Sequence, residues 1–394
     1  MVAIDESTAA GVSCALTEEQ KELRRLARAF AEREIRPREA EYDVEQRHPA
    51  ELIAQAHSLG LMNLHVPAEY GGLELSAFDG LLVGEELYRG CSGIGTSITA
   101  NGLGSGPVII FGTPEQKARW LPPLVEQPIL CSFALSEPGA GSDVAALRST
   151  AVREGDEYIL NGSKTFITNA GHAEWAVVFA KTDPSAGRRG MSAFVVEMGS
   201  PGVTIEKHLE KMGQRATDTS AFALHDVRVP VDNRLGEEGD GFKIAMATLD
   251  FTRPGTAIGA VGVAQAAYEH ALEYAKERVT FDLPIAMHQA VGFMVADMAT
   301  EIQASRLLCW QAAWMLDSGM GREATLYSSF AKRFAADTAM KVTTDAVQVL
   351  GGYGYIKEYP VEKLMRDAKL FQIYEGTSQI QRLVIAREIF TPKG

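Results

Sequence analysis

The chain has 394 residues, of which 46% are hydrophobic and 23% are charged, as is typical of a soluble globular protein. A chain of this length is too long to form a single domain with one hydrophobic core and too short for more than about three domains. The formal net charge of −13 argues against a nucleic-acid partner. It does not exclude an anionic ligand, because a locally basic pocket can exist on an acidic protein.

No apolar run approaches the roughly 20 residues that a membrane-spanning helix needs, so we expect no membrane partner. Residues 1–7 are acidic and lack the apolar segment of a signal peptide, so we expect a cytoplasmic protein with no signal, transit or transmembrane segment. The cysteines are scattered, which predicts neither a metal site nor a redox pair. They are Cys14, Cys91, Cys131 and Cys309.

Residues 1–125 are predicted to form an N-terminal all-α domain. Thr17 and Gln20 fit a capping box, and apolar residues recur after them at helical spacing. Further helices are expected at 49–59, 79–88 and 114–121. The glycines of residues 102–106 superficially resemble a dinucleotide-binding loop, but no strand precedes them, so we reject that interpretation.

Residues 126–235 are predicted to form a small, mostly antiparallel β-domain, because short β-rich runs replace the helical periodicity and no crossover helix separates them. Asn161-Gly162 between two such runs predicts a type I′ hairpin. Other strands are expected at 175–180, 192–197, 221–224 and 227–230.

Residues 236–394 are predicted to form a bundle of about four helices, at 241–278, 288–318, 322–350 and 377–390. Small residues on one face of the first of these helices favour close packing. They are Ala257, Ala260, Val261, Ala264 and Ala267. The fold class is therefore α+β, with a β-domain between two helical domains.

Four separated motifs occur together in this order: residues 135–143 (LSEPGAGSD), 166–169 (FITN), 348–354 (QVLGGYG) and 374–382 (YEGTSQIQR). As a set, and with residues 365–369 (MRDAK), they resemble the acyl-CoA dehydrogenase family over nearly the whole chain. The C-terminal third is most similar to the medium-chain and short-chain branches. The resemblance implies the three-domain fold, bound FAD, a homotetramer, and electron transfer to an electron-transferring flavoprotein.

Removal of a thioester α-proton needs a positioned base and stabilisation of the developing enolate oxygen. Glu375 stands where the family has its catalytic base, and a dry pocket would raise its proton affinity. Tyr374 and Gly376 flank it and are expected at the substrate, where the Glu375 amide would bind the thioester carbonyl. Some branches place the base on the helix that here carries Thr252, so this chain uses the other position.

Residues 250–254 match the family segment that holds the acyl-CoA. Asp250 and Thr252 are expected to contact CoA, and so is Ser142. For Arg253 we leave two roles open, a ligand contact and a structural salt bridge, because a guanidinium beside apolar helix sequence needs a partner.

The resemblance assigns the flavin contacts to five segments of the chain. Phe166 and Thr168 would face the isoalloxazine ring, although many relatives carry Trp at Phe166 and a core aromatic is the alternative. Thr377 fits a helix N-cap as well as a flavin contact. An Arg278–pyrophosphate pair is chemically reasonable; residues 278–289 and 348–352 would reach FAD across a subunit interface. The expected flavin residues are Phe133, Leu135, Ser136, Gly141, Ser142, Phe166, Thr168, Arg278, Thr280, Phe281, His288, Gln289, Gln348, Gly351, Gly352, Thr377 and Gln379.

The expected reaction is α,β-dehydrogenation of a short-to-medium acyl-CoA. Residues 96–100 are expected to lie at the far end of the acyl pocket, and their small neutral side chains leave a dicarboxylyl or branched substrate open. The sequence also leaves open the physiological direction of the reaction. Two further hypotheses are a flavin oxidase or monooxygenase on the same scaffold and a non-catalytic acyl-CoA binding protein. The retained Glu375 motif favours the dehydrogenase over both.

Overall fold

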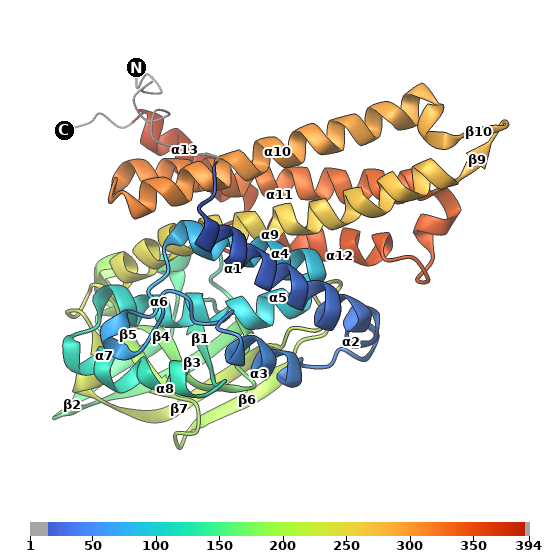
Figure 1. Ribbon diagram of the computed structural model, residues 1–394. Coiled ribbons are helices and arrows are strands. Elements are labelled where there is room, and N and C mark those ends of the chain that lie inside the picture. The colour runs from blue at the N-terminus through green and yellow to red at the C-terminus, as the bar shows by residue number, and fades with distance from the viewer. Residues whose placement is uncertain (1–14, 391–394) are drawn as a thin grey trace.

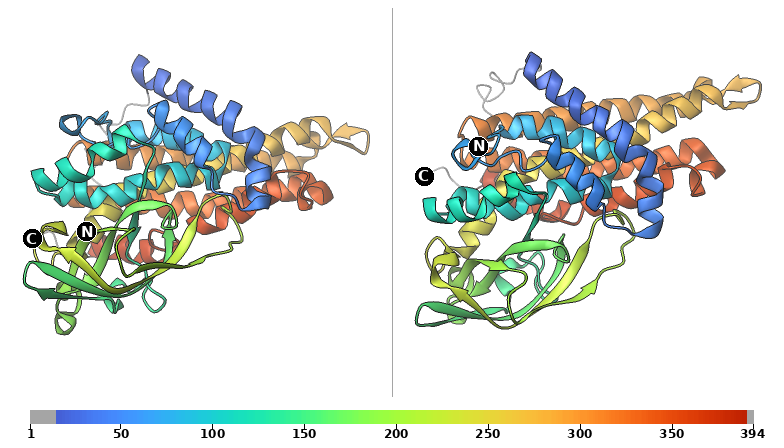
Figure 2. Two further views of the ribbon diagram at one scale, coloured as in Figure 1. Left: turned by 90° about the horizontal axis from the view of Figure 1, so that it is seen from below. Right: turned by 60° about the horizontal axis from the view of Figure 1, so that its bottom comes forward.

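The computed structural model describes residues 15–390, so Cys14 and the acidic N-terminal segment lie outside the described residues. The β-domain lies on one side of the molecule, the long C-terminal helices lie above it, and some of the short N-terminal helices lie beside its strands (Figures 1 and 2). The other three cysteines are buried and unpaired. None of the described helices is long and apolar enough to cross a bilayer.

The N-terminal segment is helical, as predicted. Its helices are α1 (Glu18–Phe30), α2 (Glu39–Glu45), α3 (Ala50–Ser58), α4 (Ala77–Gly90), α5 (Ser92–Thr99), α6 (Asn101–Phe111), α7 (Pro114–Trp120) and α8 (Pro122–Glu126). The capping box at α1 is confirmed, because the Gln20 amide donates to Thr17 Oγ1 at 3.2 Å and Gln20 Oε1 accepts from the Thr17 amide at 3.1 Å. Residues 102–106 lie within α6 and form no loop.

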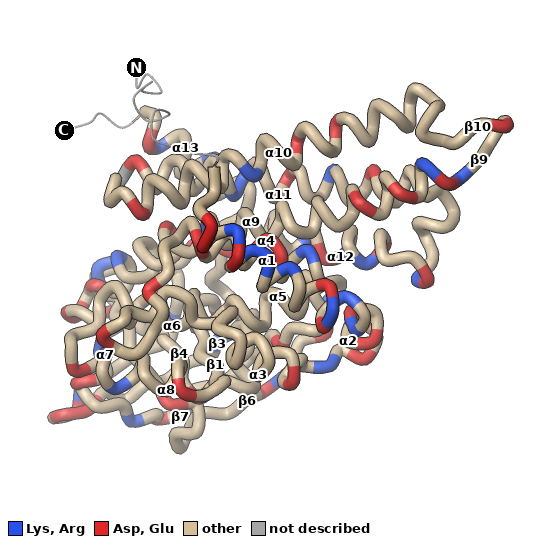
Figure 3. Tube along the Cα trace, viewed as in Figure 1, with Lys and Arg blue, Asp and Glu red and all other residues tan. Residues whose placement is uncertain are grey.

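Charged residues of both signs alternate along α1 (Figure 3). Arg24 and Arg28 of this helix each reach the buried carboxylate of Glu86 on α4, both at 2.8 Å. Burying a carboxylate is costly unless it is paired and hydrogen-bonded, so the arginines are needed there. These ion pairs join α1 to the helix that packs against the C-terminal bundle.

The middle segment forms one sheet with the strand order β6-β7-β3-β2-β4-β5-β8, and β1 pairs with β4. Its strands are β1 (Leu130–Ala134), β2 (Thr150–Glu154), β3 (Glu157–Thr168), β4 (Ala173–Lys181), β5 (Met191–Glu197), β6 (Val203–His208), β7 (Thr219–Pro230) and β8 (Arg234–Leu235). Among the described strand pairs of this sheet, β1–β4 and β2–β4 are parallel and the others are antiparallel, which agrees with the predicted mostly antiparallel sheet.

The hairpin predicted at Asn161-Gly162 is wrong. Both residues lie inside β3, where the register against β7 shifts between Leu160 and Gly162. Gly162 has φ 148°, and an added Cβ would lie 2.2 Å from Ser149 Oγ, so close packing explains this glycine. The real turn comes earlier, at Gly155 between β2 and β3.

The C-terminal segment contains the long helices of the bundle. Its elements are α9 (Gly241–Glu277), β9 (Val279–Thr280), β10 (Leu283–Pro284), α10 (Gln289–Asp317), α11 (Arg322–Leu350), α12 (Val361–Phe371) and α13 (Ser378–Phe390). The small residues of α9 are buried as expected, and a Cβ added at Gly262 would lie 2.4 Å from the Glu85 carbonyl oxygen of α4. The sequence analysis did not predict α12. The β9–β10 hairpin extends beyond the far end of the bundle (Figure 1).

Candidate active site

Glu375 lies in the turn between α12 and α13, with its carboxylate against α9. Thr252 Oγ1 donates to Glu375 Oε2 at 3.1 Å. Burial raises the pKa of Glu375, and the hydroxyls of Thr256 and Thr252 lower it again in part. The sequence analysis named Thr252 as a CoA contact and as the alternative base position that this chain does not use, and the structure places it directly beside the carboxylate. A half-buried carboxylate of this kind is suited to accept a proton.

The backbone of this turn is held in the left-handed region, with φ 50° at Glu375 and φ 84° at Gly376. Gln381 Nε2 donates to the carbonyl oxygens of both residues at 3.1 Å. Thr377 is confirmed as the N-cap, because its Oγ1 accepts from the Ile380 amide at 3.1 Å. A glutamate rarely adopts positive φ, so the turn depends on these surrounding contacts.

A second support of the turn is Lys332 of α11, whose Nζ donates to the Gly376 carbonyl oxygen at 2.6 Å. Lys332 is fully buried. The sequence analysis missed both Lys332 and Gln381. A lysine within an amphipathic helix is usually solvated, and only the tertiary contact distinguishes this one.

Arg253 forms a salt bridge with Asp250, one of the two roles that the sequence left open for it. Asp250 also accepts from Thr325 Oγ1 at 2.8 Å. The Arg253 side chain is buried, and its Nε has no hydrogen-bond partner among the described residues. The ion pair thus accounts for the charge of Arg253 and leaves one guanidinium nitrogen for a further contact.

The loop of residues 135–143, which contains Gly139 and Gly141, follows β1 and is fixed by a buried ion pair. Lys164 Nζ lies 2.7 Å from Glu137 Oε1 and also donates to the Phe179 carbonyl oxygen at 2.7 Å. Burial lowers the pKa of Lys164 to about 8. Beyond this anchor, Gly141 and Ser142 are exposed, as a ligand-binding loop requires. The sequence analysis did not identify the Glu137–Lys164 pair, because the two residues are far apart in the chain.

Strand β3 presents Phe166 to solvent. Its side chain is 69% exposed and its φ is 59°, so the core alternative for this aromatic is wrong. Thr168 is half-buried, and its carbonyl oxygen accepts from Ser132 Oγ of β1 at 2.8 Å. On β1 and just after it, Leu135 is buried, and Phe133 and Ser136 are partly exposed. The Ser136 carbonyl oxygen accepts from the Thr165 amide of β3 at 3.0 Å.

A cavity of about 450 Å³ near the hairpin end of the bundle brings together several expected flavin residues. Arg278, Thr280, Gly351 and Gly352 line it. The Arg278 guanidinium lies 5.7 Å from the centre of the Tyr353 ring. Within one chain this cavity lies at the end of the bundle opposite α13, so the structure does not bring it together with the Glu375 turn (Figure 1).

The remaining residues of the hairpin region have separate positions. His288 Nε2 lies 3.0 Å from Thr280 Oγ1, a contact that closes the base of the hairpin. Phe281 is 91% exposed at the hairpin tip. Gln289, Gln348 and Gln379 are exposed on α10, α11 and α13.

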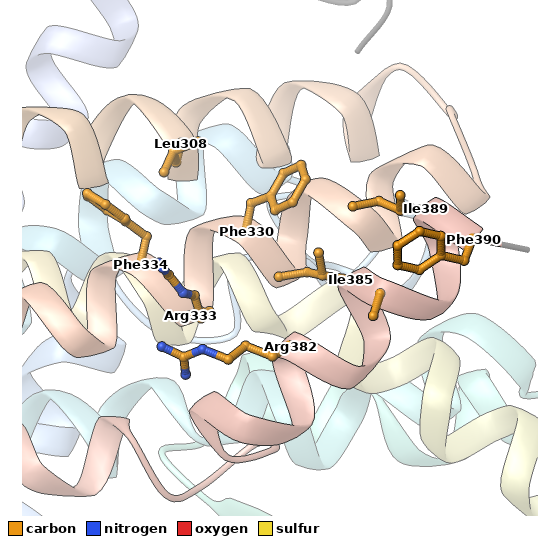
Figure 4. A pocket seen from close by; sticks show the side chains of 9 residues that line it. Leu308, Phe330, Arg333, Phe334, Arg382, Ile385, Ile389 and Phe390 are labelled. Carbon is orange, nitrogen blue, oxygen red and sulfur yellow. The ribbon is translucent and has the colours of Figure 1, made fainter. Parts of the chain in front are cut away.

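A second cavity, of about 520 Å³, lies between α10, α11 and α13 (Figure 4). Its walls are apolar apart from Arg333 and Arg382, and it includes none of the residues that the sequence analysis assigned to the site. The lining residues are Leu308, Phe330, Arg333, Phe334, Arg382, Ile385, Ala386, Ile389 and Phe390.

The residues present fit an FAD molecule. A Cβ added at Gly351 or Gly352 would meet no atom within 4 Å, so a ligand can approach this backbone closely. Arg278 offers a cation for a pyrophosphate, and the exposed Phe166 offers an aromatic face for a flat ring. Together with the half-buried carboxylate of Glu375, these features fit an FAD-dependent oxidoreductase.

Comparison with known proteins gives the family. Family profiles described as the N-terminal, middle and C-terminal domains of acyl-CoA dehydrogenase match residues 17–128, 132–227 and 239–390. The chain belongs to the acyl-CoA dehydrogenase family.

Two curated relatives illustrate its range. The chain is 47% identical to a cyclohex-1-ene-1-carbonyl-CoA dehydrogenase of Geobacter metallireducens, over 96% of this chain and 99% of that protein. It is 44% identical to the mitochondrial short-chain specific acyl-CoA dehydrogenase of Bos taurus, over 95% of this chain and 90% of that protein.

Solved structures agree with the fold. Butyryl-CoA dehydrogenase of Megasphaera elsdenii superposes with a TM-score of 0.94 at 42% identity, over 96% of this chain and 100% of that chain. A chain solved in work on the electron transferring flavoprotein of Acidaminococcus fermentans also gives a TM-score of 0.94, at 44% identity over 96% of this chain and 100% of that chain.

Proposed function

We propose that the protein converts a short-to-medium acyl-CoA to its trans-2-enoyl-CoA, with Glu375 as the base that removes the α-proton. The observation that carries the proposal is the carboxylate of Glu375, half-buried and fixed by Thr252 at 3.1 Å. When bound, FAD accepts the hydride that leaves Cβ. The proposal keeps residues 1–125, 126–235 and 236–394 as the domains that build this site.

The chain's own groups would act as follows. The carboxylate of Glu375 takes the α-proton, and its elevated proton affinity lets it hold that proton in a dry pocket. The Glu375 amide donates to the thioester carbonyl oxygen, where negative charge develops. The fixed turn keeps the base and the amide in register with the substrate.

The other site residues are proposed in the roles that the family resemblance gives them. Ser142, Asp250, Thr252, Arg253, Tyr374 and Gly376 would contact the substrate. Phe133, Leu135, Ser136, Gly141, Phe166, Thr168, Thr377 and Gln379 would hold the flavin end of FAD. Arg278, Thr280, Phe281, His288, Gln289, Gln348, Gly351 and Gly352 would hold the FAD of a neighbouring subunit.

The length of the acyl chain would be limited by Tyr88. Its hydroxyl lies 3.0 Å from Thr99 Oγ1, so Thr99 does not leave open space at this point. A Cβ added at Gly259 would lie 3.0 Å from the Tyr88 ring, which therefore packs about one helical turn beyond Thr256 on α9. A turn rises only about 5.4 Å, room for a few methylene groups. This favours short chains and agrees with the butyryl-CoA and short-chain relatives.

A dicarboxylyl or branched substrate is the second candidate. The Tyr88 hydroxyl is surrounded by the hydroxyls of Thr96, Thr99 and Tyr374, and Gln214 follows beyond Thr96. None of these four side chains carries a positive charge that would pair with a terminal carboxylate. The similarity to a cyclohex-1-ene-1-carbonyl-CoA dehydrogenase favours testing cyclic acyl groups as well.

Electron transfer to an electron-transferring flavoprotein and a homotetrameric assembly complete the proposal. The similarity to a chain from the Acidaminococcus fermentans flavoprotein work supports the first. The exposed Phe281 at the tip of the projecting hairpin supports the second, because a large apolar residue that is 91% exposed favours contact with another surface.

Anaerobic mixing of the FAD-loaded protein with acyl-CoAs tests the proposal. The panel runs from four carbons upward and includes adipyl-CoA and cyclic and branched members. We expect bleaching of the flavin absorbance, fastest with short linear chains, and slow reoxidation when air is admitted. Fast reoxidation with peroxide release would indicate an oxidase instead, and no bleaching by any member would refute the proposed function.

A further inference from the structure

Lys332 is a buried cation directly behind the Glu375 turn. It lies near the middle of α11, has no exposed surface, and donates from Nζ to the Gly376 carbonyl oxygen at 2.6 Å. Burying an ammonium group is costly unless it is paired or hydrogen-bonded. The Gly376 carbonyl satisfies one N–H of this ammonium group, and the roles proposed above do not include its charge.

The charged groups around Lys332 and Glu375 come from several elements. Lys332 is faced by Glu375 of the turn, Arg253 of α9 and Asp337 of its own helix. Burial lowers the pKa of Lys332 to about 8, and the negative charge of Glu375 opposes that decrease. The lysine is therefore charged at neutral pH.

Glu375 has a corresponding environment. The hydroxyls of Thr256 and Thr252 face it from α9, and the cations Lys332 and Arg253 favour its ionised form. The phenol groups of Tyr88 and Tyr374 also lie in its field. Arg253 already forms a salt bridge with Asp250, which offsets its charge. Of the two cations near Glu375, Lys332 therefore has the charge that is less offset by another partner.

We propose that Lys332 is a positioning residue for Glu375: its ammonium group fixes the carbonyl of Gly376 and keeps the neighbouring base ionised and ready to accept a proton. This role rests on the proposed function, since it concerns the base of that reaction. A positioning role for Lys332 accounts for two observations at the site. The turn has left-handed backbone that needs external support, and the carboxylate is in a place where burial favours its protonated form.

Three substitutions separate the charge of Lys332 from its hydrogen bond. Lys332→Met removes both, Lys332→Gln removes the charge but keeps an N–H donor, and Lys332→Arg keeps both. Lys341→Met is the control, because Lys341 lies exposed on the same helix and pairs with Glu301 at 2.6 Å, away from the turn. The readout is the rate of anaerobic flavin bleaching by an acyl-CoA as a function of pH.

In the wild type the rate rises with pH as Glu375 ionises. We expect the acidic limb of this profile to move to higher pH by about one unit in Lys332→Met and Lys332→Gln, because both variants lose the positive charge that favours the ionised carboxylate of Glu375. Lys332→Arg and Lys341→Met keep the limb in place. Lys332→Met also lowers the limiting rate by about tenfold to a hundredfold, through misplacement of the turn.

The outcomes are distinct. Variants that lose rate equally at all pH values, with the acidic limb unmoved in both neutral variants, would show a merely structural lysine and overturn the proposal. If Lys332→Met does not fold, the limb of Lys332→Gln decides by itself. A wild type that no acyl-CoA bleaches overturns the proposed function, and this role with it, whereas normal bleaching with an unmoved limb overturns this role alone.

Discussion

Replacing Tyr88 by alanine tests the proposed end of the acyl pocket. The ring packs against Gly259 and its hydroxyl lies 3.0 Å from Thr99 Oγ1, so alanine opens space at the proposed end of the acyl pocket. If the space admits two further methylene groups, each worth about 0.8 kcal/mol on burial, longer chains gain about 1.6 kcal/mol. At about 1.36 kcal/mol per factor of ten, this is about a 15-fold gain in kcat/KM for six-carbon over four-carbon substrates.

The assay is steady-state turnover of linear acyl-CoAs of increasing length, with the ratio of kcat/KM values as the readout. Tyr88→Phe is the matched control: it keeps the ring and loses only the hydroxyl, so we expect the wild-type length preference. Truncation of this buried aromatic costs about 3–5 kcal/mol of stability, and the assay is therefore run well below the unfolding temperature. An unchanged length ratio in folded Tyr88→Ala would refute the placement of Tyr88 at the pocket end.

Three further predictions concern other parts of the structure. Lys164→Met leaves Glu137 buried without its cation and should cost about 3–5 kcal/mol in thermal unfolding, whereas loss of the exposed Arg119–Glu197 pair should cost at most about 1 kcal/mol; equal effects would contradict this. Burial lowers the pKa of His48 from 6.5 to about 4, so the unfolded chain binds the proton more tightly than the folded chain. The free energy of unfolding should therefore fall by up to about 3 kcal/mol as the pH is lowered from about 6.5 to about 4, and this pH dependence should weaken in His48→Gln. Arg278→Gln should release FAD on dilution by ultrafiltration, and retention equal to the wild type would exclude the Arg278–pyrophosphate contact.

Local signals in the sequence predicted most of the fold. The capping box at Thr17, the small residues on α9 and the alternating runs of the β-domain each depend on neighbours a few residues away, and the structure confirms them. Asn161-Gly162 misled because a turn signal can equally mark a bulge inside a strand. Helix α12 was missed because two of its charged residues, Lys363 and Asp367, are buried and pair with each other at 2.8 Å.

Within the candidate site, too, the sequence identified residues of one local motif and missed residues that depend on tertiary packing. Glu375 and the N-cap Thr377 lie in one contiguous motif, so sequence alone could identify them. Lys332 and Gln381 support the same turn, but Lys332 is separated from it by more than 40 residues and meets it only through the packing of α11. The exposure of Phe166 also depends on the sheet around it, since an aromatic on a strand is usually buried.

The most direct test of the central claim is anaerobic flavin reduction by acyl-CoA in Glu375→Gln. The amide keeps the shape of the side chain and cannot accept the α-proton. We expect the variant to bind FAD and remain yellow, with the rate of bleaching reduced by at least about 10²–10⁴-fold. Glu358→Gln, a change at an exposed glutamate, should bleach at the wild-type rate. A near-normal rate in Glu375→Gln would contradict the assignment of Glu375 as the base.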